Sequence, residues 1–176
     1  YRELDTLLSF ANSVDVVTFD HEHVPTVLLD ELETRGVQVR PGPHALIFAQ
    51  DKALMRQRLT ETSVPLPDWR VATGAEQVEE FVGKHAGEAI AKTPRGGYDG
   101  KGVRAIQSAA DVADWLALGE VLLEEKVSFS RELAQLVARS PSGEVRIFPL
   151  VETVQKDGVC AEVIAPAPGA PEDLCA

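Results

Sequence analysis

The sequence predicts an α/β protein whose C-terminal part is an antiparallel sheet, and three observations support this prediction. Residues 1–43 alternate apolar strands with a helix, which is the βαβ rhythm of a parallel sheet. Residues 64–127 have the pattern strand, helix, hairpin, helix and strand. From Arg131 onward, short apolar segments follow one another across turns at "SPSG" and "KDG". We therefore expect four parts, at 1–43, 44–63, 64–127 and 128–176.

The first part should contain two helices and two strands. "DVVTFD" is a short apolar run rich in β-branched residues, which favours a buried strand. Pro25 and Gly36 mark the start and the end of the second helix, because proline suits the first helical turn and glycine the residue after the last. The expected elements are a helix at 6–13, a strand at 15–20, a loop at 21–25, a helix at 25–36 and a strand at 37–43.

The second and third parts carry helix-capping signals. Asp51 is placed to cap a helix over "KALMRQRLTET", the helical connector, and "SVPLPDW" after it should be extended because of its prolines. Thr73 and Glu76 predict a capping box for a helix that runs to about Ala86. Ser108 and Asp111 predict a second box. The unit should open with a strand in the extended segment "SVPLPDW", and the other strands expected around these helices are 89–93, 103–106 and 120–127.

Composition restricts the classes of function. The chain has 176 residues, 44 % of them apolar, and a net charge of −11, which argues against nucleic acid or an anionic membrane as the main partner. It has no run of eighteen apolar residues and no signal-peptide pattern at its start. The two cysteines, Cys160 and Cys175, have no metal-like neighbours, so we expect a reduced, cytoplasmic setting. The first residue is not Met, the chain opens inside an apparent helix, and it stops at "PEDLCA", where a new helix begins, so we expect a piece of a longer chain.

A glycine-rich stretch, "PRGGYDGKG" at 94–102, is the most informative motif. It is not a P-loop, because Arg95 and Gly102 stand where that motif needs glycine and Ser or Thr. "GKGVRA" fits the loose dinucleotide pattern, but it opens a strand rather than a helix. What remains is a hairpin loop whose backbone N–H groups could close over phosphates, with Lys92 supplying charge on the preceding strand. Composition alone leaves an exposed hairpin equally open.

Three further stretches could contribute to a site, and each has a simpler structural explanation. "VLLEEKV" ends in Glu124, Glu125 and Lys126, which could read a nucleoside or only end a buried strand. Arg131 and Glu132 could form a surface pair, and Lys52 could be a solvated helix start. "TFDHEHVP" at 18–25 follows a strand and could bind substrate. We disfavour a zinc site there, because adjacent residues seldom supply a tetrahedral ligand set.

In their order along the chain, five segments resemble the N5-carboxyaminoimidazole ribonucleotide synthetases, which are ATP-grasp enzymes of purine biosynthesis. "GGYDGKG" after a lysine-bearing strand is the most specific of them. The resemblance covers nearly the whole chain. The segments are "DVVTFDHEHVP", "QDKALMRQRL", "AKTPRGGYDGKG", "LLEEKVSFSREL" and "PLVETVQKDGV".

The resemblance implies a fold and a set of site residues. Residues 1–43 would end a Rossmann-like pre-ATP-grasp domain, 64–127 would be the small flap subdomain, and 128–176 would begin the ATP-grasp C-terminal subdomain. Asp99 and Tyr98 would be catalytic, and Glu22, Asp20 and Arg95 would bind substrate. The implied ATP-binding residues are Lys52, Lys92, Gly97, Tyr98, Asp99, Gly100, Lys101, Gly102, Glu124, Glu125, Lys126, Val127, Glu132 and Gln155.

The implied reaction is carboxylation. ATP would phosphorylate bicarbonate, and the carboxyphosphate would carboxylate the exocyclic amine of 5-aminoimidazole ribonucleotide. ATP and Mg²⁺ are the implied cofactors, with the metal ligands outside this stretch, and the whole enzyme would be a homodimer without nucleic-acid or membrane partners. The stretch alone would be inactive. Asp20, His23 and Gln155 depart from the family pattern.

Two alternatives to this reaction stay open. One is another ATP-grasp carboxylase or a formate-dependent transformylase, which the acceptor would distinguish. The other is a non-catalytic nucleotide-binding module, which would bind ATP normally without turnover.

Overall fold

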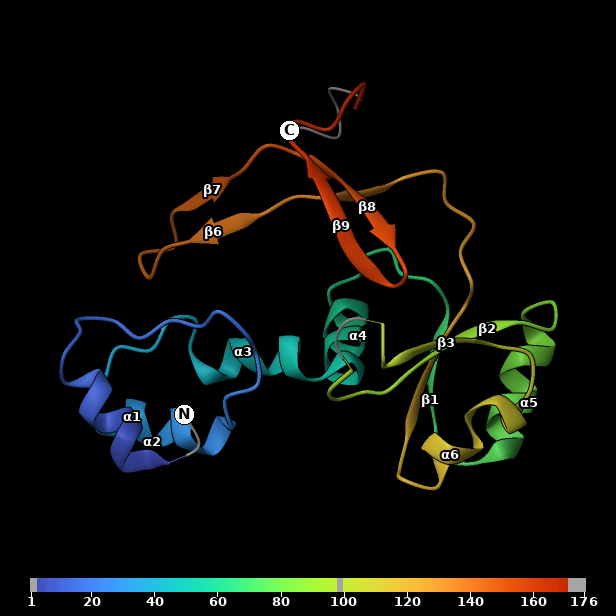
Figure 1. Cartoon of the computed structure of the whole chain (residues 1–176), viewed down its shortest axis with the longest axis horizontal. Helices are drawn as coiled ribbons and strands as arrows, with labels where there is room; N and C mark the ends of the chain where they lie inside the picture. The colour runs from blue at the N-terminus through green and yellow to red at the C-terminus, as the bar shows by residue number, and fades with distance from the viewer. Residues whose placement is uncertain (1–2, 98–99, 171–176) are drawn as a thin grey trace. The chain divides into compact units, whose positions relative to one another are not determined.

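The computed structural model describes residues 3–97 and 100–170 (Figure 1). The predictions for Tyr98 and Asp99 therefore lie outside the described residues. The described chain forms two compact units, and we describe each by itself. Unit 1 holds the residues up to Gly97 together with Gly102–Lys126. Unit 2 holds residues 100–101 and the chain from Val127 onward.

Unit 1 begins with four helices, which confirms the helices predicted at 6–13, at 25–36 and after Asp51. Gly36, with φ of 84°, ends the second helix as expected. Leu29, Leu32 and Val39 are almost fully buried in a small apolar core beneath the first three helices. The helices are α1 (Leu4–Ala11), α2 (Thr26–Thr34), α3 (Pro43–Gln50) and α4 (Lys52–Glu61).

The two strands predicted at 15–20 and 37–43 are wrong as strands. Only a single parallel bridge joins Val17 to Val39, with hydrogen bonds from Val17 N to Gln38 O (2.9 Å) and from Arg40 N to Val17 O (2.8 Å). No third strand lies beside the pair within the described residues. An isolated pair of short strands is marginal in water, and parallel pairing is the weaker kind.

A four-stranded antiparallel sheet forms the centre of the rest of unit 1. Its order is β1-β4-β2-β3, so β4 lies between β1 and β2 although it comes last in the chain. β2 and β3 form the hairpin predicted around the glycine-rich stretch, with Lys92 opposite Val103 at the end next to the connecting loop. The strands are β1 (Trp69–Ala72), β2 (Ala89–Lys92), β3 (Val103–Ile106) and β4 (Val121–Glu124).

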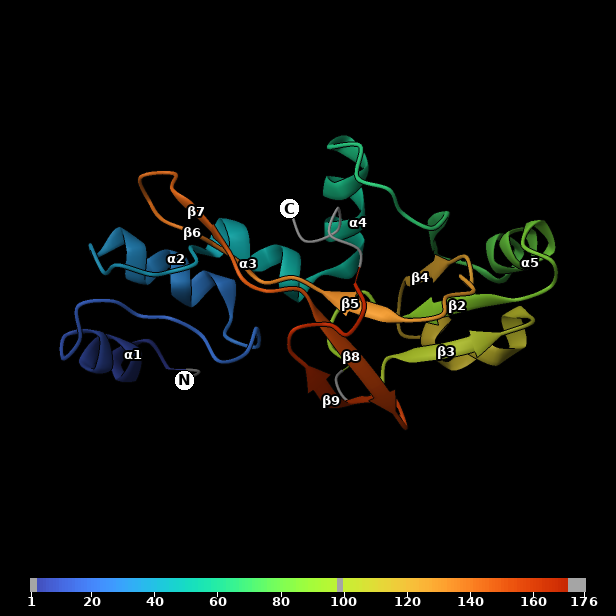
Figure 2. The ribbon, with the colours of Figure 1, turned by 90° about the horizontal axis from the view of Figure 1, so that it is seen from above.

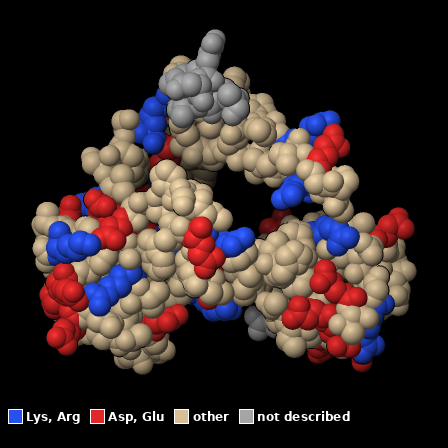
Figure 3. Space-filling view, turned by 180° about the vertical axis from the view of Figure 1, so that it is seen from behind, with Lys and Arg blue, Asp and Glu red and all other residues tan. Residues whose placement is uncertain are grey.

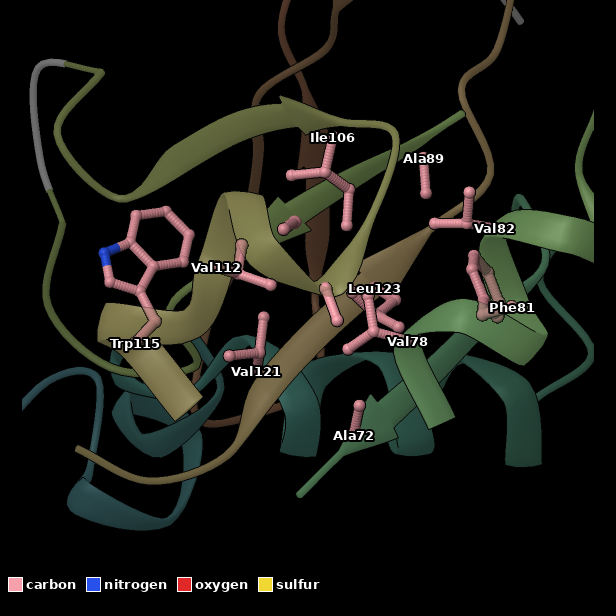
Figure 4. Packing of buried hydrophobic residues seen from close by; sticks show 12 residues of the cluster. Ala72, Val78, Phe81, Val82, Ala89, Ile106, Val112, Trp115, Val121 and Leu123 are labelled. Atoms are coloured by element: carbon pink, nitrogen blue, oxygen red, sulfur yellow. The ribbon is translucent and has the colours of Figure 1, made fainter. Parts of the chain in front are cut away.

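Helix α5 (Ala75–Lys84), the 3₁₀ helix η1 (Ala109–Val112) and α6 (Ala113–Leu116) supply apolar side chains that pack against this sheet (Figure 4). Val78, Val112 and Leu123 meet in the same core and are fully buried. This packing fixes the sheet, and with it the positions of Lys92 and Glu124 at the strand ends.

One of the two predicted capping boxes is confirmed and the other is wrong. Both hydrogen bonds of the Ser108–Asp111 box are present. Helix α5 instead begins one residue later than expected, with Gly74 as its N-cap, and Gln77 Oε1 accepts from Thr73 N at 2.7 Å. Gln77 rather than Glu76 therefore closes the turn.

Unit 2 consists of antiparallel strands, as predicted from Arg131 onward (Figure 2). They form a three-stranded sheet, β5-β8-β9, and a separate two-stranded ribbon, β6-β7. Asp157 and Gly158 form the tight turn between β8 and β9, both with positive φ. The strands are β5 (Glu132–Ala134), β6 (Val137–Arg139), β7 (Val145–Ile147), β8 (Val151–Lys156) and β9 (Val159–Ile164). The predicted α/β fold class is thus confirmed, while the four-part division stays a prediction.

Candidate functional site

Asp51 links the start of helix α4 to the base of the glycine-rich stretch. Its Oδ1 accepts hydrogen bonds from the backbone N–H groups of Ala53 and Leu54, both at 3.0 Å, which caps α4 as the sequence predicts. Its Oδ2 accepts from Arg95 Nε at 2.9 Å, and the two residues also form a backbone bridge. One buried carboxylate therefore fixes both a helix terminus and Arg95.

Lys52, the next residue, also contacts the base of the glycine-rich stretch. Its backbone N donates to Pro94 O (2.9 Å), and its Nζ donates to Gly96 O (2.8 Å). Partial burial lowers the pKa of Lys52, Glu22 acts against this, and the nearby Lys92 ammonium lowers the pKa further. Two positive charges therefore lie close enough to repel each other, which favours an anion between or beside them.

Glu124 is a buried carboxylate held between two cations. Its Oε1 accepts from Arg56 Nε at 2.5 Å, and its Oε2 accepts from Lys92 Nζ at 2.5 Å. Burial raises the pKa of Glu124, but the hydrogen bonds from Arg56 and Lys92 outweigh it and hold the pKa below its usual range. Glu124 is thus ionised at neutral pH, and Lys92 reaches it from the neighbouring strand.

A polar pocket of about 220 Å³ brings together Glu22, Lys52 and Arg95. Gln50, the last residue of α3, fixes the loop on one side of it. Gln50 Nε2 donates to Glu22 O and to Val24 O, both at 2.8 Å, and its Oε1 accepts from Thr26 Oγ1 at 2.8 Å. The loop predicted to bind substrate is therefore held by an amide that uses both of its N–H groups and its oxygen.

Gly97 and Gly102, within the glycine-rich stretch, meet in a close backbone crossing. A Cβ added to Gly97 would lie 2.6 Å from Gly102 Cα and 2.9 Å from Thr93 Oγ1. Gly97 also has φ of 71°, so its backbone conformation favours glycine as well. In unit 2, a Cβ on Gly100 would lie 3.3 Å from Gly158 Cα. Glycine is thus required for steric reasons at the neck of the loop, between β2 and β3.

The other predicted site residues are placed as follows. Asp20 does not join Glu22, because it lines a different, largely apolar pocket beside α1 and α2. Glu125 N donates to Asp68 O at 2.8 Å, and Lys126 forms an exposed ion pair with Glu88 at 2.7 Å. Lys101 is exposed. Tyr98 and Asp99 lie outside the described part of the chain.

Three further predicted residues belong to unit 2, besides Gly100 and Lys101. Val127 is exposed, and Glu132 begins β5 opposite Thr153. Gln155 follows the irregularity in β8 and is exposed. The surface pair considered for Arg131 and Glu132 is wrong, because Arg131 Nη2 pairs with the Glu152 carboxylate at 2.6 Å instead.

Sequence reasoning missed Arg56, Gln50 and the pairing of Asp51 with Arg95. Arg56 had a usable signal, since it lies four residues after Lys52 and so falls on the same helix face. Gln50 had none, because its partners are backbone carbonyls of a loop more than twenty residues away.

Charged side chains of both signs lie on the surface of this acidic protein. Lys, Arg, Asp and Glu side chains are interspersed on the face shown in Figure 3. Among the described residues, no three His, Cys, Asp or Glu side chains gather in a way that could hold a metal ion. Over those same residues, none of the helices is long and apolar enough to cross a membrane.

Comparisons with known proteins identify similar domains and similar whole proteins. Residues 57–174 match the ATP-grasp domain family, and residues 1–50 match the ribonucleotide synthetase preATP-grasp domain. The N5-carboxyaminoimidazole ribonucleotide synthase of Mycobacterium tuberculosis H37Rv is 46 % identical over 99 % of this chain, which spans 42 % of that protein.

Two solved structures of the Aspergillus clavatus enzyme are also similar. The carboxyaminoimidazole ribonucleotide synthase complexed with ATP has a TM-score of 0.86 and 27 % identity, and the match covers 99 % of this chain and 47 % of that one. The complex with ADP and 5-aminoimidazole ribonucleotide has a TM-score of 0.84 and 25 % identity, over 99 % and 46 % of the two chains. With its ATP-grasp match extending from residue 57 to residue 174, the chain belongs to the ATP-grasp family.

Proposed function

We propose that the protein containing this chain is an ATP-dependent carboxylase that converts 5-aminoimidazole ribonucleotide and bicarbonate to N5-carboxyaminoimidazole ribonucleotide in purine biosynthesis. The observation that carries the proposal is the 46 % identity, along 99 % of this chain, to a protein of that name. The chain spans less than half of that relative, so the activity is proposed for the whole protein.

Lys52 and Lys92 are the proposed ligands of the ATP phosphates. Lys52, at the start of α4, donates to Gly96 O beside the neck of the glycine-rich loop. Lys92 is the last residue of β2, the strand that leads into the loop. Gly97 to Gly102 would form the flap over those phosphates. Glu124 to Val127 would hold adenine and ribose, with Glu132 near the ribose and Gln155 on the nucleotide side. The position of Glu124 at the end of a buried central strand supports this assignment.

The pocket beside Gln50 is the proposed acceptor side of the site. Arg95 offers a cation for the acceptor phosphate or the bicarbonate, and Glu22 offers a carboxylate for hydroxyl or amino groups. Asp99 and Tyr98 would meet the acceptor from the flap. The place of Asp20 beside α1 and α2 gives no support to a role in binding.

The proposed chemistry has two steps. A bicarbonate oxygen attacks the γ-phosphorus of ATP, which yields carboxyphosphate and ADP. The exocyclic amine of the ribonucleotide then attacks the carboxyl carbon, inorganic phosphate leaves, and the amine loses a proton. Carboxyphosphate reacts readily with water, so the flap has to exclude solvent while the lysines balance the negative charge.

The test is ADP formation by the full-length protein with ATP, magnesium and bicarbonate, measured with and without 5-aminoimidazole ribonucleotide. We expect strong dependence on the ribonucleotide. ADP formation that is indifferent to it would refute the acceptor and favour another ATP-grasp carboxylase or a transformylase. ATP binding without any ADP formation would favour a non-catalytic module.

Three further expectations stay predictions. They are that the whole protein is a homodimer, that it is cytoplasmic, and that residues 1–176 alone are inactive. Light scattering of the full-length protein and an assay of this chain by itself would test the first and the last.

A further inference from the structure

We infer that Arg56 is a positioning residue that keeps the Glu124 carboxylate neutralised and in place, so that Lys92 is free to exchange Glu124 for a phosphate group of the nucleotide. This inference rests on the proposed role of Lys92 and on nucleotide binding, but not on the identity of the acceptor.

The three side chains come from three different elements of unit 1. Arg56 lies on α4, Lys92 at the end of β2 and Glu124 at the end of β4. Each cation takes its own carboxylate oxygen, Arg56 Nε on Oε1 and Lys92 Nζ on Oε2, both at 2.5 Å. The side chains are 16 %, 22 % and 6 % exposed, respectively. The group is therefore largely shielded from water and has one positive charge in excess.

Because two cations share one carboxylate, one of them can leave Glu124 while the other still neutralises it. Removing one partner of a buried ion pair is strongly destabilising, because the other charge is left without compensation. If Lys92 leaves Glu124, the bond from Arg56 still neutralises the carboxylate. Without Arg56, of these two cations Lys92 alone would neutralise Glu124. Its departure would then leave a buried carboxylate without compensation. The free-energy cost of that unneutralised buried charge would weaken the affinity for the phosphate group.

The two cations also differ in mobility and hydrogen-bonding geometry, and this difference suits the proposed exchange. A lysine ammonium is a compact charge on a flexible stem, and it can reorient toward a new anion. The Arg56 guanidinium is planar and always protonated, so it remains a fixed donor. Burial raises the pKa of Glu124, but the two cations outweigh burial and hold the pKa below its usual range, so the carboxylate stays ionised and continues to need a partner. Arg56 is thus suited to stay and Lys92 to move.

A purely structural role for Arg56, in which it only ties α4 to the sheet, makes a different prediction. It would change stability without a selective effect on nucleotide affinity. If loosening of α4 also weakened nucleotide binding, a second substitution at Glu124 would not restore the affinity, because it removes the same tie between α4 and the sheet. Rescue at Glu124 therefore distinguishes the two roles.

The experiment measures binding of ADP and of the β,γ-imido analogue of ATP to the full-length protein by calorimetry. We expect Arg56→Met to weaken binding at least about ten-fold, or about 1.4 kcal/mol. Arg56→Lys should keep most of the affinity because it keeps the charge. The matched control is Arg58→Met on the same helix, where the side chain is 58 % exposed and pairs only weakly with Glu61, and it should bind like the wild type.

The decisive variant is the double substitution Arg56→Met with Glu124→Gln. It removes both the arginine and the charge that holds Lys92, so it should bind nucleotide as tightly as Glu124→Gln alone. Wild-type affinity in Arg56→Met, or a double variant no better than Arg56→Met, would overturn the inference. If ADP formation by the wild type did not depend on the ribonucleotide, the proposed acceptor would be refuted, but these nucleotide affinities would still test the role of Arg56.

Discussion

Replacing Gly97 with alanine should destabilise the protein far more than the same replacement at Gly96. Both glycines have positive φ, 71° and 69°, so an alanine at either position meets the same backbone penalty. They differ in the space around the added methyl group. Nothing lies within 4 Å of a Cβ at Gly96, whereas a Cβ at Gly97 would lie 2.6 Å from Gly102 Cα and 2.9 Å from Thr93 Oγ1.

The magnitude follows from these two terms. An L-residue in the left-handed region costs about 1–2 kcal/mol, which both variants should lose. Carbon atoms prefer separations of about 3.5–4.0 Å, so the methyl group at Gly97 overlaps Gly102 backbone by roughly 1 Å. Overpacking of that kind costs about 1–3 kcal/mol, and a backbone atom cannot rotate away as a side chain would. Gly97→Ala should therefore be about 1–3 kcal/mol less stable than Gly96→Ala.

Urea unfolding of both variants measures this difference directly. Calorimetric affinity for ADP should be measured alongside it, because a loop that rearranges locally can avoid part of the global cost while losing the flap geometry. We expect Gly97→Ala to show lower stability, weaker nucleotide binding, or both. Equal unfolding free energies and equal affinities for the two variants would refute the argument that the crossing with Gly102 sets the neck of the loop.

Three further predictions concern residues around the junction. Gln50→Ala leaves the Glu22 and Val24 carbonyls without their donor, so urea unfolding should show a loss of about 2 kcal/mol, and the KM for the ribonucleotide should rise more than that for ATP. Asp51→Ala should lose about 1–2 kcal/mol in urea, because α4 loses its cap, whereas Asp51→Asn keeps an accepting oxygen and should lose less. The folded-state pKa of Glu124 is lowered, so its contribution to stability is present above the unfolded-state pKa and is lost as pH falls through the folded-state pKa. Unfolding of Glu124→Gln should therefore depend less on pH on the acidic side, and an unchanged slope would contradict the ion-pair assignment.

Local signals in the sequence predicted most of the fold. The Ser108–Asp111 box, the Asp51 cap, the Gly36 helix end and the strands on either side of the glycine-rich stretch are all present, because each depends on residues close together in the chain. The strands at 15–20 and 37–43 failed for the opposite reason. A strand needs neighbours to accept its hydrogen bonds, and residue periodicity does not say whether they are there.

The site divides in the same way. Glycine content identified the loop, and a lysine before it identified the phosphate-binding candidate, since both features lie within about ten residues. The partners of these residues lie much farther along the chain. Lys92 and Glu124 are 32 positions apart, Asp51 and Arg95 are 44 apart, and Arg56 and Glu124 are 68 apart.

The sequence by itself thus determined the class of fold, the caps at Asp51 and Ser108 and the glycine-rich hairpin, because backbone conformation and capping depend on nearest neighbours. Only the tertiary structure decided that Arg56 and Lys92 share one carboxylate, that Gln50 fixes the loop at Glu22, and that Gly97 and Gly102 touch. Those contacts exist because the packed sheet and helices bring distant residues within hydrogen-bond distance. Burial then makes each charge depend on its partner.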